Sequence, residues 1–270
     1  MWPMRTPHLV STYCIETGGS SFGMSFMGQS SSYSDDKILR LVTKVYSLLT
    51  SISGLPTVET TLEIRKRLRM SSIDFWYSIG STYTYLTVLR LPKLAVANGI
   101  EISWRPFNVR DVMVEQKNIP FSNKPVKAAY MWRDIERRSR MYGLEPKIPA
   151  PYPLSGLVLA NQIAILGKEE GWIEAYTQAT YRRWFEKGEP AGEEPNISGS
   201  LTEIGQDVDR VMGLATSQEI VSMLDKETVE AKALGVFGSP SFVVSGEVFW
   251  GDDRLEDAIS WTLRGSLAPI

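Results

Sequence analysis

Cysteine and histidine are almost absent from this chain, and both occur only near its start. Among its 270 residues the only cysteine is Cys14 and the only histidine is His8. From Met70 onward there is neither a thiol nor an imidazole, which excludes a disulfide framework, a Cys/His metal site, a Ser-His-Asp triad and a cysteine nucleophile there. We therefore predict no metal site, and chemistry that uses hydroxyls, carboxylates, Lys or Arg side chains, backbone amides or a bound cofactor.

The composition and charge are those of an ordinary globular protein. Hydrophobic residues make up 43% of the chain and charged residues 22%, and the net charge is −2. Because nucleic-acid-binding proteins usually carry a strong basic excess, we expect no nucleic acid as a partner. No apolar run reaches the roughly 18 residues of a membrane span. We therefore expect no membrane partner and a cytoplasmic location.

Residues 1–69 differ in texture from the rest of the chain and are predicted to form an extension. Residues 1–34 are rich in Ser, Gly and Met without a clear period, which predicts disorder, whereas residues 35–52 carry apolar side chains at helical spacing. One alternative is an organellar targeting peptide, but acidic residues such as Asp35 and Asp36 are uncommon in transit peptides. The other is an upstream extension of a protein whose natural start is Met70.

Residues 70–270 begin with the pattern of a β-α-β unit. The aromatic and β-branched run IDFWYSI (73–79) predicts a strand. Ser81 opens an apolar helical stretch that closes at Asn98-Gly99, and the run IEISWRPF (100–107) predicts the second strand.

The rest of this part predicts helices followed by a hairpin and a last helix. Between about residues 108 and 234 we find helical patterns only, and SFVVS (241–245) and EVFW (247–250) then meet at Gly246, which is typical of a hairpin. The order β-α-β, helical insertion, β-β-α is that of an α/β thioredoxin-like fold. A helical insertion at this point is typical of its DsbA-like branch.

Four segments, in this order, resemble the 2-hydroxychromene-2-carboxylate isomerases and the related kappa-class glutathione transferases. They are DFWYSIGSTYTYL (74–86), WRPF (104–107), KNIPFSNKPVKAAYMWRDIERRSRMYGL (117–144) and GVFGSPSFVVSGEVFWGDDRL (235–255). The resemblance covers about residues 72–262. It departs from the family pattern at Thr82, which stands where a Pro usually follows the Ser.

This resemblance implies a glutathione-dependent isomerase that takes part in aromatic compound catabolism. In the family's reaction the glutathione thiolate adds to a conjugated aromatic 2-oxo or hemiketal acid, rotation follows, and elimination returns glutathione. For this chain the resemblance therefore implies glutathione as the cofactor and a small aromatic carboxylate as the substrate. Relatives also suggest a homodimer.

The resemblance gives Ser81 the catalytic role. The thiolate of glutathione is the nucleophile, and a helix N-terminus favours an anion. The hydroxyl of Ser81 could donate a hydrogen bond to the sulfur and lower the pKa of the thiol. The alternative is that Ser81 is only the N-cap of the helix.

Further residues are predicted to bind glutathione. Ser239 and Pro240 take the place of the fold's cis-proline, where a cis peptide would turn the backbone of Ser239 toward a peptide ligand; the alternative is a trans turn proline. Asp252, Asp253 and Arg254 would hold the γ-glutamyl group, or else only cap the last helix. Asn118 matches a family position that touches glutathione, and is otherwise a turn residue.

Some charged and aromatic side chains are candidates for substrate contact. Four cations could attract a carboxylate substrate, namely Arg105, Lys127, Arg133 and Arg137, although a solvated helix face is the favoured explanation for any one of them. Four aromatic residues are predicted to be core rather than substrate-stacking residues, namely Trp76, Tyr77, Trp132 and Trp184.

Three other functions compete with the isomerase. A kappa-like glutathione transferase would release conjugates, and a catalytically inactive module would only bind glutathione or a peptide, an alternative that Thr82 keeps open. A DsbA-type disulfide oxidoreductase needs a Cys-x-x-Cys motif near residues 78–81. The sequence there is Ser-Ile-Gly-Ser, which argues strongly against it.

Overall fold

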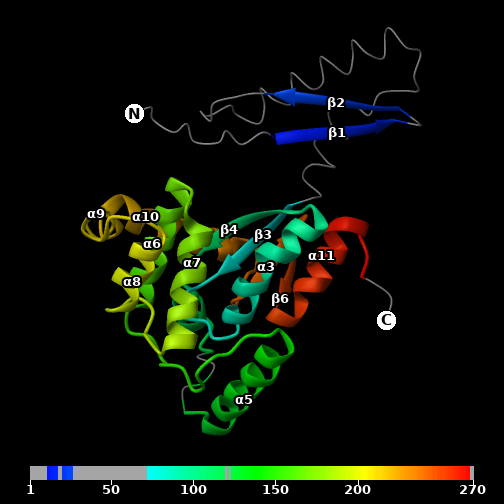
Figure 1. Cartoon of the computed structure of the whole chain (residues 1–270). Helices are drawn as coiled ribbons and strands as arrows, with labels where there is room; N and C mark the ends of the chain where they lie inside the picture. The colour runs from blue at the N-terminus through cyan, green and yellow to red at the C-terminus, as the bar shows by residue number, and fades with distance from the viewer. Residues whose placement is uncertain (1–10, 18–19, 27–71, 119–120, 122, 268–270) are drawn as a thin grey trace, which may run out of the picture. The chain divides into compact units, whose positions relative to one another are not determined.

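The computed structural model describes residues 11–17, 20–26, 72–118, 121 and 123–267. The chain divides into two compact units, Met1–Ile64 and Arg65–Ile270 (Figure 1). Within the described ranges, no helix is long and apolar enough to cross a membrane.

The first unit contains a β-hairpin. Strand β1 (Ser11–Thr17) pairs antiparallel with β2 (Ser20–Phe26), in a register that places Thr17 opposite Ser20. For these strands the expectation of disorder over residues 1–34 is wrong. Two glycines separate the strands in the sequence, and a two-residue Gly-Gly connection is a hairpin signal that outweighs the polar composition. The helix expected over 35–52 lies outside the described residues.

The second unit is built on a four-stranded mixed sheet. Its order is β4 (Glu101–Pro106), β3 (Ser72–Tyr77), β5 (Ser241–Val244) and β6 (Glu247–Trp250). Strands β3 and β4 are parallel, while β5 is antiparallel to both β3 and β6. Helix α3 (Thr84–Asn98) connects the parallel pair, and α11 (Leu255–Arg264) follows the hairpin. The predicted thioredoxin-like fold is therefore confirmed.

Side chains on β3 alternate between two hydrophobic cores, as the pleat of a strand requires. Phe75 lies in the larger core, where its ring centroid is 4.9 Å from that of Tyr77 and 5.5 Å from that of Phe242. Trp76 lies in the smaller core with Phe107. Because both faces are covered, β3 is buried throughout its last three residues, which are all aromatic.

The helical insertion lies between β4 and β5 along the chain. Helices α6 and α7 pack on each other, and α6 also contacts β4, so the insertion is anchored on the sheet. Its elements are α4 (Val109–Glu115), α5 (Pro125–Met141), α6 (Leu157–Glu170), α7 (Ile173–Arg182), the π-helical turn η1 (Arg183–Lys187), α8 (Asn196–Glu203), α9 (Val208–Ala215) and α10 (Gln218–Ala233).

We expect a shortened chain that begins at Met70 to fold by itself. The sheet of the second unit starts at Ser72, so this truncation removes none of its strands. The melting temperature should stay within a few degrees of that of the full chain. Differential scanning calorimetry on the two chains makes the comparison, and a broad, non-cooperative transition of the short chain would show that the extension contributes to the core.

Candidate active site

The loop from Ser78 to Ser81 joins β3 to α3 and holds its hydroxyl groups in a tight turn. The backbone N–H of Ser81 donates to the carbonyl of Ser78 at 3.0 Å. Gly80 has a φ of 147°, a conformation that L side chains rarely adopt, so glycine is required beside Ser81. Ser81 itself is half-buried, whereas Ser78 is fully buried.

Ser81 faces the peptide bond between Ser239 and Pro240, which lies just before β5. Its hydroxyl donates a hydrogen bond of 2.6 Å to the carbonyl oxygen of Ser239. The peptide is cis, which confirms the expected conformation. The structure therefore brings together two predicted site elements that are 158 residues apart in sequence.

Ser81 does not cap the helix that follows it. Helix α3 begins at Thr84, and its N-cap residue is Tyr83, with no side-chain capping bond among the described residues. The capping alternative for Ser81 is therefore wrong. The Ser81 loop still lies at the N-terminal end of α3, where the first N–H groups have no partner within the helix and the helix dipole favours an anion.

Asn161 on α6 fixes the Ser81 loop from the interior. It is fully buried, and its Oδ1 accepts from the N–H of Ile79 at 2.9 Å. Its Nδ2 donates to the carbonyls of Ile79 (3.1 Å) and Leu157 (2.7 Å) and reaches the Ser78 hydroxyl at 3.3 Å. One side chain thus satisfies both backbone polar groups of Ile79, as a buried turn requires.

Two further buried hydroxyl groups complete this support. The Tyr181 hydroxyl donates to the carbonyls of Ser78 (2.9 Å) and Ser81 (3.2 Å). Burial raises the pKa of Tyr181 well above its ordinary value, so the phenol stays a donor. The Ser239 hydroxyl accepts from the N–H of Ser78 and lies 2.9 Å from the Thr84 hydroxyl.

Sequence reasoning missed this supporting network. A signal for one member was available, because Asn161 interrupts the apolar stretch LVLANQIAIL with a polar side chain that a buried helix must pair. Nothing in the pattern pointed to Tyr181, which shares its helical periodicity with ordinary core aromatics.

Asp253 and Arg254 lie in the short turn η2 (Asp252–Arg254) that precedes α11. Each side chain is half exposed, and the pair is joined by contacts of 3.4 Å to each other and 2.9 Å from Arg254 to Asp257. Because exposed ion pairs are weak, each of these side chains can leave its present partner and pair with a charged group of a ligand. The binding of a ligand group by this pair stays a prediction.

Asp252, in contrast, points into the protein. Its side chain is 1% exposed, and its Oδ1 accepts from Arg90 at 2.9 Å and from the Thr87 hydroxyl at 3.0 Å. Burial raises the pKa of its carboxyl above the ordinary value, and Arg90 acts in the opposite direction. The predicted direct contact of Asp252 with a ligand is corrected on this ground, because its carboxylate is already enclosed and paired.

Arg105 is also placed differently from the expectation. Its guanidinium lies over the ring of Trp76, in the smaller core, and pairs with Glu227 at 2.6 Å and Glu230 at 2.7 Å. Arg105 is next to the last residue of β4, and both of its carboxylate partners belong to α10. A role for Arg105 in attracting a substrate carboxylate is therefore corrected, since its charge is already neutralised.

The other two predicted contacts lie at the surface. Asn118 is exposed directly after α4, and its backbone N–H donates to the carbonyl of Met113 at 2.8 Å. Lys127 is exposed on α5, with Nζ 5.8 Å from the centre of the Phe121 ring. Residues 119–120 and 122 between them lie outside the described residues, so both roles stay predictions.

Aromatic side chains extend from the core to the surface beside the Ser81 loop. Thr82 is tied to α5 by a contact of 3.0 Å to the sulfur of Met131, the neighbour of Trp132. The centroid of the Trp132 ring is 6.1 Å from that of Tyr152, which is 6.0 Å from that of Phe121. Trp132 is only partly buried, unlike the expectation that it belongs to the core. The other three predicted core aromatics, Trp76, Tyr77 and Trp184, are fully buried.

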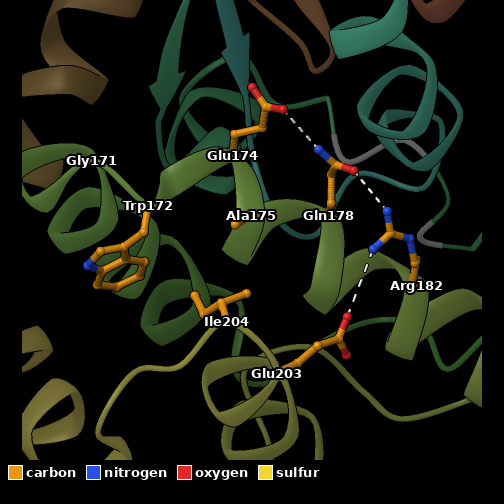
Figure 2. Close-up of a pocket in the computed structure, with 8 residues that line it drawn as sticks. All are labelled: Gly171, Trp172, Glu174, Ala175, Gln178, Arg182, Glu203 and Ile204. Carbon is orange, nitrogen blue, oxygen red and sulfur yellow. Dashed lines mark hydrogen bonds and ion pairs between the residues drawn. The ribbon is translucent and has the colours of Figure 1, made fainter. Parts of the chain in front are cut away.

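A hollow of about 510 Å³ lies elsewhere, on the outer side of α7. Figure 2 shows Gln178 between Glu174 and Arg182 and bonded to both, and Arg182 is also 3.9 Å from Glu203. It contains none of the predicted site residues. In the described part of the chain, no three His, Cys, Asp or Glu side chains gather in a way that could hold a metal ion.

Comparison with known proteins agrees with this geometry. Residues 72–259 match the DsbA-like thioredoxin domain family. A 2-hydroxychromene-2-carboxylate isomerase of Sphingobium xenophagum is 29% identical over 194 residues, which cover 71% of this chain and 98% of that protein. Glutathione S-transferase kappa 2 of Caenorhabditis elegans is 22% identical and covers 73% and 94%.

Solved structures agree as well. A 2-hydroxychromene-2-carboxylate isomerase structure superimposes with a TM-score of 0.64 at 26% identity, and covers 72% of this chain and 97% of that one. A probable DsbA oxidoreductase of Streptomyces coelicolor gives a TM-score of 0.58 at 18% identity, with coverage of 74% and 92%. With a fold, a matched range and relatives of nearly full length in agreement, this chain belongs to the DsbA-like thioredoxin domain family.

Proposed function

We propose that this chain is a glutathione-dependent isomerase of the 2-hydroxychromene-2-carboxylate isomerase type, and that it acts on aromatic carboxylates. The observation that carries the proposal is the contact of 2.6 Å between the Ser81 hydroxyl and the Ser239 carbonyl at a cis-proline. It places a hydroxyl donor and a peptide acceptor side by side at the end of a helix that favours an anion.

The groups at this site fit the chemistry of glutathione. When bound, glutathione supplies a thiolate nucleophile. The Ser239 carbonyl suits an amide N–H of the tripeptide, and this exchange releases the Ser81 hydroxyl, which can then donate to the sulfur. The half-exposed Asp253 and Arg254 carry the two charges that a γ-glutamyl ammonium and carboxylate would meet.

The rim beside the Ser81 loop supports an aromatic, anionic substrate. Phe121, Trp132 and Tyr152 form a row of partly exposed rings, which can stack on a planar ligand. Lys127 lies beside Phe121. Burial raises the pKa of Tyr152, and the positive charge of Arg110 acts in the opposite direction. Two cations therefore border the rings, and Arg110 replaces Arg105 as the candidate partner of a carboxylate.

A kappa-like glutathione transferase is the second candidate, favoured by the relatives that carry this name. The two activities use the same thiolate and differ in its fate, because an isomerase returns glutathione and a transferase consumes it. A dithiol oxidoreductase finds no support, since Ser78 and Ser81 occupy the ends of the corresponding motif.

Glutathione accounting during turnover tests the proposal. The enzyme is incubated with a 2-hydroxychromene-2-carboxylate at many equivalents over glutathione, and both the isomer and the free thiol are measured. We expect many turnovers with no net loss of thiol, and no turnover without glutathione. Loss of one thiol per product identifies the transferase. Binding of glutathione with no turnover identifies a module without catalysis.

Arg254→Ala and Asp253→Ala should weaken glutathione binding without unfolding the protein. Both side chains are half exposed, so neither contributes much to the core, whereas a lost charge-assisted contact costs about 1.5–3 kcal/mol. The dissociation constant should therefore rise by roughly one to two orders of magnitude. Isothermal titration calorimetry measures it, and unchanged affinity in both variants would remove this part of the site.

A further inference from the structure

The carboxylate of Asp252 is the anchor of the turn that carries Asp253 and Arg254. Arg90 donates from one nitrogen to both its Oδ1 (2.9 Å) and its backbone carbonyl (3.3 Å), so side chain and main chain are held together. Thr87 adds a hydrogen bond of 3.0 Å. The side chains of Asp252 and Arg90 are 1% and 11% exposed, so water screens this pair weakly.

Both partners of Asp252 belong to α3, the helix that begins just after the Ser81 loop. Thr87 and Arg90 lie in its first two turns, because α3 starts at Thr84. Helix α3 therefore connects the Ser81 loop, which precedes it, with the η2 turn, which is bonded to its first two turns. If glutathione binds with its sulfur at the Ser81 loop and its γ-glutamyl group at the η2 turn, α3 sets the distance between these two binding positions.

Helix α5 closes the arrangement from a third side. The ring of Tyr142 lies 3.8 Å from the Arg90 guanidinium, and its hydroxyl is 3.5 Å from Asp252 Oδ2. Arg138 is 3.9 Å from the same oxygen and 3.2 Å from the Tyr142 hydroxyl. The carboxylate of Asp252 therefore meets α3 and α5 at once, and a neutral side chain would lose both cationic partners.

We propose that Asp252 is a positioning residue, which through Arg90 holds Asp253 and Arg254 in the orientation that receives the γ-glutamyl group. This inference rests on the proposed use of glutathione and deepens it. Asp252 touches no ligand in this role. It acts by keeping two half-exposed side chains and their backbone preorganised, so that binding does not have to order them.

A double-mutant cycle on glutathione binding tests the proposal with the full-length protein. Asp252→Asn keeps the shape and the Thr87 contact but removes the charge that Arg90 and Arg138 hold. We expect the dissociation constant for glutathione to rise about tenfold in the wild-type background. In a background that carries both Asp253→Ala and Arg254→Ala the same change should alter it by less than about twofold, because the two side chains that Asp252 orients are then absent.

Glu227→Gln is the matched control. Glu227 is also a carboxylate between two cations, with its side chain 13% exposed and 2.6 Å from both Arg105 and Lys168, but it lies on α10. It should lower the stability to urea by an amount similar to Asp252→Asn and leave glutathione affinity unchanged. Arg90→Gln gives the second measurement if Asp252→Asn does not fold, with the same expected tenfold loss.

The outcomes separate this inference from the proposed function. A wild-type protein that does not bind glutathione overturns both. A wild-type protein that binds glutathione, combined with an unchanged affinity of Asp252→Asn or with equal losses in the two backgrounds, overturns the positioning role alone. An equal loss of affinity in Glu227→Gln also overturns it, because general destabilisation would then explain the effect.

Discussion

Ser81→Ala should raise the pKa of bound glutathione by about one to two units. In the structure the Ser81 hydroxyl already donates at 2.6 Å to a carbonyl at the site, so it is oriented as a donor. A hydrogen bond to an ion is worth about 1.5–3 kcal/mol, and one pKa unit corresponds to about 1.4 kcal/mol. Because the bond favours the charged thiolate, its loss moves the pKa upward.

The ultraviolet absorbance of the thiolate reports this pKa directly in a pH titration of the complex. Below the shifted pKa the variant holds mostly thiol, so its activity at neutral pH should fall, and part of that activity should return as the pH is raised. The stability of the protein should drop by only about 1 kcal/mol, the ordinary value of one hydrogen bond.

Thr84→Val provides the control for this titration. The Thr84 hydroxyl is fully buried and lies 2.9 Å from the Ser239 hydroxyl, on the interior side of the site. This variant removes a nearby hydroxyl that does not face a ligand. It should lower stability and leave the thiol pKa unchanged. If the titration curve of Ser81→Ala coincides with the wild-type curve, Ser81 does not stabilise the thiolate, and the N-terminus of α3 alone does so.

Asn161→Leu should destabilise the protein by about 3 kcal/mol and disturb the site with it. The substitution keeps the branched shape of the side chain but leaves the N–H and C=O of Ile79 buried without partners, and each such group costs about 1–3 kcal/mol. For a domain of this size the melting temperature should fall by roughly 6–12 °C. Glutathione affinity should fall too, because the Ser78–Ser81 loop loses its inner support.

Gln162→Leu is the matched control for Asn161→Leu. Gln162 is the next residue on α6 and is 9% exposed, and its side chain has no hydrogen bond among the described residues. Calorimetric melting of the two variants should therefore differ by several degrees, with Gln162→Leu near the wild type. Equal melting temperatures would show that the loop around Ile79 finds other partners when Asn161 is absent.

The sequence alone determined the fold class, because its information is local and periodic. The aromatic and β-branched run of β3, the helical spacing of α3 and the hairpin at Gly246 are each read within ten to fifteen residues. Their order then restricts the topology to a thioredoxin-like sheet with an insertion. Ser81 and the Ser239–Pro240 peptide stand at the boundaries of such elements, and their expected roles came from the resemblance to the isomerase family.

The partners of each charged and polar side chain were decided only by the tertiary structure. Asp252, Asp253 and Arg254 are adjacent in sequence and all charged, yet Asp252 is enclosed and paired with Arg90 while the other two are half exposed. Arg105 meets Glu227, 122 residues away, and Asn161 meets Ile79, 82 residues away. Such pairings depend on which surfaces the packed helices bring together. A local pattern in the sequence carries no information about contacts between residues so far apart in the chain.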